Sequence, residues 1–206
     1  VWALCSCAGD GAVPPFDPTL PTDRGTDHST FVDAGLEAAV RGALEQPRGP
    51  LAAADLATLL QLDASRRDIT DLVGIDRLPS LRQVLLAHNR VNDLAPLASL
   101  DRLEVLDLSD NGLQTLSTWR GPFRLTHLNL DFNSLASIAI VGTFDSLTLL
   151  NLVDNLVRDT SVLVGLTHLR HVELSGNPLN QPSLLEHLPA LVRRGVQVNL
   201  TTTTDA

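Results

Sequence analysis

The chain has 206 residues, of which 44% are hydrophobic and only 3% are aromatic, and its formal net charge is −9. This length and hydrophobic content suit one folded domain with a modest tail. All 15 cationic side chains are arginines, because lysine is absent, and they form no basic stripe. Composition therefore argues against a nucleic-acid partner, whose phosphates require such a stripe. It favours a basic partner or one without strong charge.

The first seven residues, VWALCSC, end in a cysteine that follows the small residue Ser6, with Leu4 three positions before it. This arrangement resembles a bacterial lipobox, in which the cysteine becomes acylated after export. The resemblance implies that residues 1–7 are the remnant of a signal peptide and that Cys7 is a lipid anchor. The protein would then lie in the cell envelope or outside the cell. The alternative is an unstructured tail in which Cys5 and Cys7 are incidental thiols.

Residues 8–30 are rich in glycine, proline, aspartate and threonine and have no hydrophobic period. Such a segment cannot bury enough apolar surface to fold, so we expect a disordered linker. A linker of this kind would hold a folded domain away from a lipid anchor. We expect contact with a membrane only through that lipid, because the sequence has no run of about 20 apolar residues.

Residues 31–58 have the pattern of a helical cap. Asp33 is a candidate N-cap, and one helical face then carries Leu36, Ala39, Val40, Ala43 and Leu44. Pro47 and Pro50 end this helix, and a second short helix is expected at about residues 52–58. A stack of repeats requires such a cap because its end would otherwise expose the apolar interior.

Residues 59–190 repeat one pattern with a period of 22 residues. Five asparagines stand in register, at Asn89, Asn111, Asn133, Asn155 and Asn177, each at the end of a segment such as LEVLDLSDN. Six coils begin at Leu59, Leu81, Leu103, Leu125, Leu147 and Leu169. The apolar residues before each asparagine predict a short strand, and the apolar residues after it recur every third position, which predicts 3₁₀ turns. The fold class is therefore α/β, a curved right-handed solenoid with a parallel concave sheet and a 3₁₀ or irregular convex side.

The repeat LxxLxLxxN resembles the leucine-rich repeats. The segment PLAAADLATLLQLDAS, followed by ITDLVGIDRLPSL, is similar to the cap and first coil of internalin-like bacterial proteins with 22-residue repeats. In the first coil Arg67 occupies the asparagine position and Ala64 the third leucine position, as is common for a terminal repeat. The resemblance implies a bacterial, non-enzymatic protein-binding module. A rival is a cytosolic scaffold similar to phosphatase-regulating repeat proteins, which also use 22-residue units.

The five asparagines are interpreted as structural. The chain turns out of its strand at each of them, and an amide side chain can bond the backbone groups that lose their sheet partners there. Residues 191–206 are expected to close the solenoid. Val196 and Val198 would form a last strand, with Leu191 in phase because it lies 22 residues after Leu169, and a polar tail would follow.

Any binding function falls to the positions that the repeat leaves free on the concave face. These are Val105, Asp107, Asp110, His127, Asn129, Asp131, Phe132, Asn151, Asp154 and Glu173. We interpret Phe132 as an apolar anchor within an acidic rim. The alternative is a solvated sheet face whose polar side chains satisfy one another.

The sequence gives little indication of a catalytic site or a metal site. His127 and His171 share one column with Leu149 between them, so their backbones stand roughly 10 Å apart, and no third ligand is evident. No catalytic motif appears in the repeats, and the sequence indicates neither an enzyme nor a cofactor. We expect a monomer that binds a protein or peptide across the concave sheet.

Overall fold

The computed structural model describes residues 31–117, 119–121 and 124–201. The expectations for Cys7, for the linker at residues 8–30 and for the tail at residues 202–206 fall outside these ranges. None of the helices in the described part of the chain is long and apolar enough to span a membrane.

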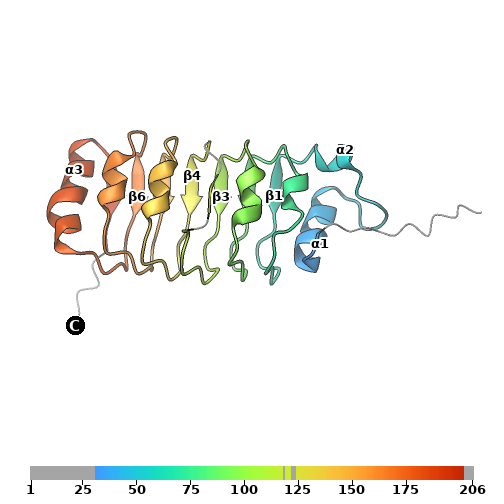
Figure 1. Ribbon diagram of the computed structural model, residues 1–206, viewed down its shortest axis with the longest axis horizontal. Helices are drawn as coiled ribbons and strands as arrows, with labels where there is room; N and C mark the ends of the chain where they lie inside the picture. The colour runs from blue at the N-terminus through green and yellow to red at the C-terminus, as the bar shows by residue number, and fades with distance from the viewer. Residues whose placement is uncertain (1–30, 118, 122–123, 202–206) are drawn as a thin grey trace, which may run out of the picture.

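One parallel sheet runs the length of the solenoid, with seven strands in the described residues (Figure 1). The strands follow chain order: β1 Gln61–Asp63, β2 Gln83–Leu85, β3 Val105–Asp107, β4 His127–Asn129, β5 Leu149–Asn151, β6 His171–Glu173 and β7 Gln197–Asn199. From β1 to β6 the register advances by 22 residues per strand, so Leu62, Val84 and Leu106 lie side by side. The central residue of each strand from β1 to β6 is buried and its two neighbours face outward. The predicted fold class is confirmed.

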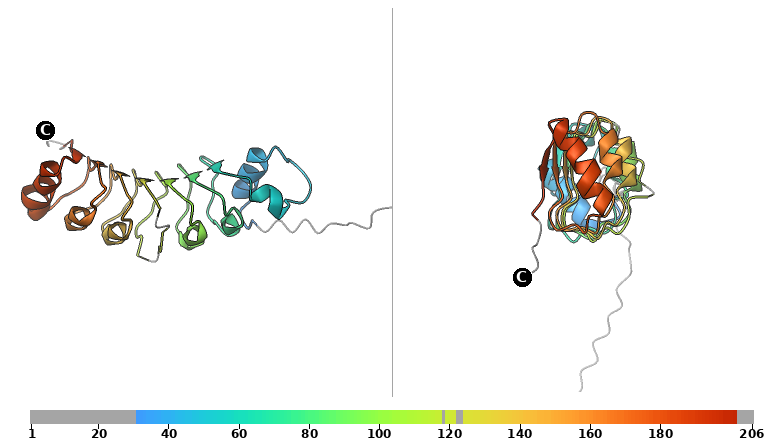
Figure 2. Two further views of the ribbon diagram at one scale, coloured as in Figure 1. Left: turned by 90° about the horizontal axis from the view of Figure 1, so that it is seen from above. Right: turned by 90° about the vertical axis from the view of Figure 1, so that its left-hand side faces the viewer.

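Short helical turns form the opposite, convex layer (Figure 2). They are the 3₁₀ turns η1 Ile75–Arg77, η2 Ala95–Ser99, η3 Ala139–Thr143 and η4 Ser161–Gly165. Each turn buries one apolar residue against the sheet, as Leu97 does in η2. Along the solenoid axis each turn takes up more width than a strand does. The solenoid therefore bends gently with the strands on its inner side (Figure 2).

The in-register asparagines connect each coil to the one before it. The Nδ2 of Asn111 donates to the carbonyl oxygens of Leu86 (2.9 Å) and Leu108 (3.1 Å), and its Oδ1 accepts from the N–H of Val91 (3.0 Å). The other four asparagines make the same bonds, to a carbonyl 25 residues earlier and an N–H 20 residues earlier. Four of the five are buried, and Asn177 in the last coil is half-buried. The amides thus replace backbone partners that the turn removes.

The third coil has no helical turn among its described residues. Trp119 takes the place of an aliphatic residue there and is buried against Phe144 of the next coil, with ring centroids 5.0 Å apart. Gly121 makes room for this contact, because a Cβ at that position would lie 2.4 Å from the Phe144 ring. Trp119 thus occupies the repeat position that Leu97 takes in the 3₁₀ turn η2 of the second coil.

The N-terminal cap consists of α1, Ala34–Ala43, and α2, Ala53–Leu56. Asp33 caps α1 by accepting from the N–H groups of Gly35 and Leu36, and it also accepts from the N–H of Thr70 in the first coil. Burial would raise the pKa of Asp33, but these backbone bonds outweigh it and lower the pKa below its usual value. Ala43 departs from the predicted buried face, because it lies exposed in the last turn of α1.

The C-terminal end differs from the expectation for Leu191. Strand β7 pairs with β6 at an offset of 26 residues, with Val172 beside Val198, so Leu191 is not in phase with the repeat. Leu191 is instead buried in α3, Leu188–Arg193, which continues from a π-helical segment, η5 Ser183–His187. The longer last coil supplies a helix that covers the end of the core.

Gly35→Ala and Gly42→Ala provide a matched test of how α1 meets the first coil. A Cβ at position 35 would lie 2.4 Å from the backbone oxygen of Arg67, whereas no atom lies within 4 Å of a Cβ at position 42. We expect Gly35→Ala to lower the free energy of unfolding by about 2 kcal/mol through overpacking. Gly42→Ala should raise it by about 1 kcal/mol, because alanine favours the helix. Urea unfolding followed by circular dichroism measures both, and equal effects would contradict this packing.

Candidate binding surface on the concave sheet

The strand register sorts the predicted concave residues into columns. Val105, His127, Leu149 and His171 form the first column, and Asp107, Asn129, Asn151 and Glu173 form the second. Asp131 lies two residues after the end of β4, and Asp110, Phe132 and Asp154 stand directly before the asparagines of three successive coils. The structure therefore brings all ten predicted residues onto one face. Whether this face binds a partner stays a prediction.

The five in-register asparagines form a ladder along the solenoid. Each residue directly before one of these ladder asparagines has a left-handed backbone, a feature that the repeat pattern did not reveal. The φ angle is 53° at Asp110, 55° at Phe132 and 51° at Asp154. Aspartate adopts this conformation readily, but a bulky aromatic residue does so at a cost of about 1 kcal/mol or more. Phe132 is also 55% exposed. Gly176 at the same position of the sixth coil was the one sequence signal for this geometry.

Asp131 is the most perturbed carboxylate on the face. Burial first, and then the carboxylates of Asp107, Glu173 and Asp154, raise its pKa to about 6, although a bond from the N–H of Val153 (2.6 Å) lowers it. Asp131 is half-buried and adjoins the exposed ring of Phe132 in the sequence. The face thus concentrates negative charge beside an apolar side chain.

Carboxylates at the two ends of this face already have partners. His88 Nδ1 lies 2.7 Å from Asp110 Oδ2, and His171 Nε2 lies 2.9 Å from Glu173 Oε1. Elsewhere on the face, no cation of the described residues forms an ion pair with Asp107, Asp131 or Asp154. The uncompensated charge therefore lies around Phe132 in coils three to five.

The histidines of this face do not converge on one point. His127 Nδ1 lies 2.9 Å from Thr126 Oγ1, while His171 contacts Glu173 and Gln197. Within the described ranges, no group of three or more histidine, cysteine or acidic side chains could hold a metal ion.

One serine, histidine and aspartate come together at the C-terminal end, a grouping that the sequence did not suggest. Ser183 Oγ is buried and donates to the carbonyl oxygen of Arg158 (2.9 Å), so its proton is already bound. His187 Nδ1 lies 3.7 Å from Asp159 Oδ1. Because Ser183 faces the interior and bonds to backbone, this trio lacks the exposed nucleophile that acyl transfer requires.

Comparisons with known proteins match the repeats. A family model described as "Leucine Rich repeats (2 copies)" matches residues 79–121. Leucine-rich repeat-containing protein 56 of Homo sapiens is 40% identical over 65 residues, which are 32% of this chain and 12% of that protein. The same protein of Rattus norvegicus is 39% identical over 82 residues, or 38% of this chain and 15% of the relative. The match thus spans a small part of these curated relatives.

Solved structures show the same fold. An internalin of Listeria monocytogenes aligns with a TM-score of 0.69 and 19% identity, covering 88% of this chain and 60% of the internalin. Internalin C2 of the same organism aligns with a TM-score of 0.60 and 22% identity, covering 85% and 96% of the two chains. A leucine-rich-repeat protein of Leptospira interrogans has a TM-score of 0.62 and 23% identity, covering 74% and 40%. The predicted resemblance to internalin-type repeats is confirmed.

Asp131→Asn tests the electrostatics of the face. The folded chain holds the pKa of Asp131 at about 6, above the ordinary 3.8. Between pH 3.8 and pH 6 the folded chain therefore binds more protons than the unfolded chain does. The ionised carboxylate therefore destabilises the fold increasingly as pH rises through this window. We expect the variant to exceed the wild type in free energy of unfolding by about 1 kcal/mol near pH 8, and the difference to vanish near pH 4.

Urea unfolding across this pH range makes the measurement. Asp145→Asn, at an exposed position of the fourth coil away from the cluster, is the control and should show no such trend. A difference for Asp131→Asn that is the same at both ends of the range would contradict the account.

Proposed function

We propose that this chain, a leucine-rich-repeat protein with an internalin-type fold, binds a protein or peptide partner on the concave face of coils three to five. Repeat solenoids use their long curved surfaces to bind other molecules. The positions that could bind are those not used to build the core or the asparagine ladder. They carry both an exposed aromatic residue and unpaired charge.

The single observation that carries the proposal is Phe132. Its ring is 55% exposed, and its backbone has a φ of 55° that disfavours a bulky side chain. Folding gains little from an exposed phenylalanine in a strained conformation. Strain of this kind collects at ligand sites, and aromatic side chains are frequent anchors of protein interfaces.

The partner that fits this surface carries an apolar side chain flanked by lysine or arginine. Asp107, Asp131 and Asp154 have no cationic partner among the described residues. Their field would orient an incoming basic segment, while the ring of Phe132 would bury an apolar group. Protonation of Asp131 below pH 6 would remove one of these charges and weaken binding.

We further propose that the domain is exported and anchored through Cys7. The proposal is supported by the lipobox-like residues 4–7 and by the linker composition of residues 8–30. An acyl chain on Cys7 would hold the domain at the membrane, with residues 8–30 between the lipid and the binding face. Mass spectrometry of the protein from its native host tests this. An unmodified Cys7 in a cytoplasmic fraction would favour the cytosolic scaffold instead.

The binding surface is tested by a triple variant, Asp107→Lys with Asp131→Lys and Phe132→Ala. Peptides selected by display against the wild-type chain should be enriched in basic residues next to an apolar one. We expect the triple variant to bind them roughly thirtyfold more weakly or worse, because it loses the anchor and reverses two charges.

A second triple variant serves as the matched control. Asp76→Lys and Asp145→Lys reverse two exposed charges elsewhere, and Leu185→Ala removes a side chain that is 71% exposed at the C-terminal end. This control should bind like the wild type. Selected peptides that bind the first variant with unchanged affinity would contradict the proposal, provided that circular dichroism shows both variants folded.

A further inference from the structure

The edge of the solenoid where the strands begin carries a second charged feature. It is separate from the acidic face, which consists of the carboxylates of the concave face. A cavity of about 440 Å³ is lined by five charged side chains, Arg82, Asp101, Arg102, Glu104 and Arg124. Arg102 and Arg124 each precede a strand, β3 and β4, whereas Asp107 and Asp131 lie at or beyond the other ends of these strands. The cavity and the acidic face thus occupy opposite edges of the same two coils.

One pair of side chains in this cavity satisfies itself. Arg82 and Glu104 are 22 residues apart and so occupy the same repeat position in successive coils. The Arg82 guanidinium forms an ion pair with the Glu104 carboxylate, with both side chains partly exposed. Stacking in register has here placed opposite charges side by side, which is the favourable arrangement.

A second pair of side chains in this cavity, Arg102 and Arg124, carries like charges instead of opposite ones. Arg102 and Arg124 are also 22 residues apart, so the repeat stacks two like charges, and both residues are exposed. No carboxylate of the described residues forms an ion pair with either guanidinium. Two like charges at the same repeat position of neighbouring coils repel each other. An anion between the two side chains would reverse that repulsion.

We propose that this cavity binds a single tetrahedral oxyanion, a phosphate or sulfate group, between Arg102 and Arg124. A guanidinium presents parallel N–H donors that match two oxygens of such a group. A tetrahedral anion has oxygens enough for two guanidinium groups at once, whereas a planar carboxylate has one bidentate edge. Three arginines and two carboxylates line the cavity, so one positive charge is in excess, which favours a single anionic group.

This assignment is independent of the binding proposed for the concave face. The chain as a whole is strongly acidic, with a net charge of −9, and would repel a free anion. The arginines that line this one cavity create a local positive field, which can attract an anion in spite of the negative net charge. Arg82 contributes a third positive charge to the lining, but Glu104 compensates it.

The test titrates the full chain with inorganic phosphate by isothermal calorimetry, in parallel with acetate and chloride. We expect saturable phosphate binding with one site and weaker acetate binding. Arg102→Gln with Arg124→Gln should weaken phosphate binding by about tenfold or more, because both charge-assisted contacts are lost. Vesicles of phosphatidylcholine with and without phosphatidic acid distinguish a lipid headgroup from a soluble phosphate as the natural source.

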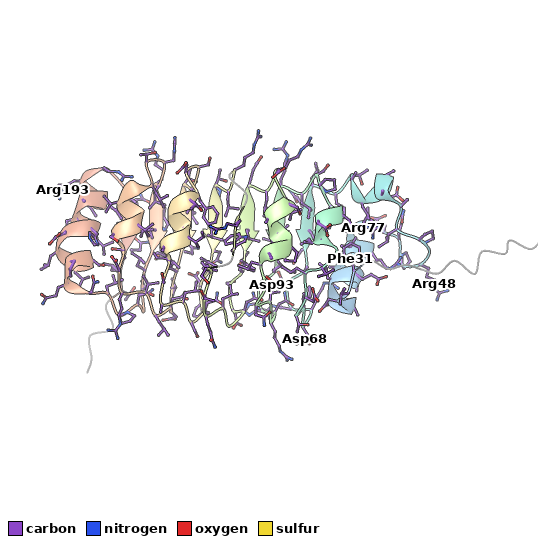
Figure 3. All side chains as sticks on the ribbon, in the orientation of Figure 1. Phe31, Arg48, Asp68, Arg77, Asp93 and Arg193 are labelled. Carbon is purple, nitrogen blue, oxygen red and sulfur yellow. The ribbon has the colours of Figure 1, made fainter. Side chains whose placement is uncertain are left out.

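The matched control is Arg48→Gln with Arg158→Gln, which removes the same charge from exposed positions outside the cavity. Arg48 lies at the N-terminal end of the solenoid (Figure 3), and Arg158 follows the asparagine of the fifth coil. This control should bind phosphate like the wild type. Phosphate binding that is absent, or that both double variants weaken equally, would overturn the proposal. Vesicle binding that the cavity variant abolishes would assign the site to a lipid phosphate.

Discussion

The fold depends on one interaction, the side-chain amide that ties each coil to its predecessor. A parallel stack of short strands leaves backbone groups without partners wherever the chain turns away from the sheet, and each strand here has three residues. The ladder asparagines supply the missing donors and acceptors, and each does so for two coils at once. Because Asn111 and three of its equivalents are buried, these bonds are shielded from water, and losing one leaves polar groups unsatisfied.

This constraint also determines where function can lie. Inward apolar residues occupy fixed positions in every coil, and the ladder asparagines do so in coils two to six. Variation on the concave face is therefore confined to the outward strand positions and to the residue before each asparagine. That residue has a left-handed backbone in every coil. Phe132 departs from the arginine, histidine, aspartate and glycine that other coils place there. On the opposite edge, the same register pairs Arg82 with Glu104 but stacks Arg102 on Arg124.

The sequence predicted the features that follow from periodicity. The strands, the 3₁₀ turns, the position of Asn111 and its equivalents, and the columns of the concave face all derive from the 22-residue spacing. What it missed depends on three-dimensional proximity. Nothing local shows that Gly35 meets the backbone of Arg67, or that Trp119 packs on Phe144. The predicted phase of Leu191 was wrong because η5 and α3 add residues to the last coil. The raised pKa of Asp131 arises first from burial and then from carboxylates on three other coils.

The central claim is that asparagine stabilises this solenoid only at the turn, through bonds to two coils. Asn111→Leu and Asn151→Leu make the same chemical change at a buried ladder position and at a half-buried position on the concave face. The account predicts that Asn111→Leu lowers the free energy of unfolding in urea by about 3 kcal/mol. Asn151→Leu should change it by less than about 1 kcal/mol. Equal losses from the two substitutions, or no loss from Asn111→Leu, would contradict the account.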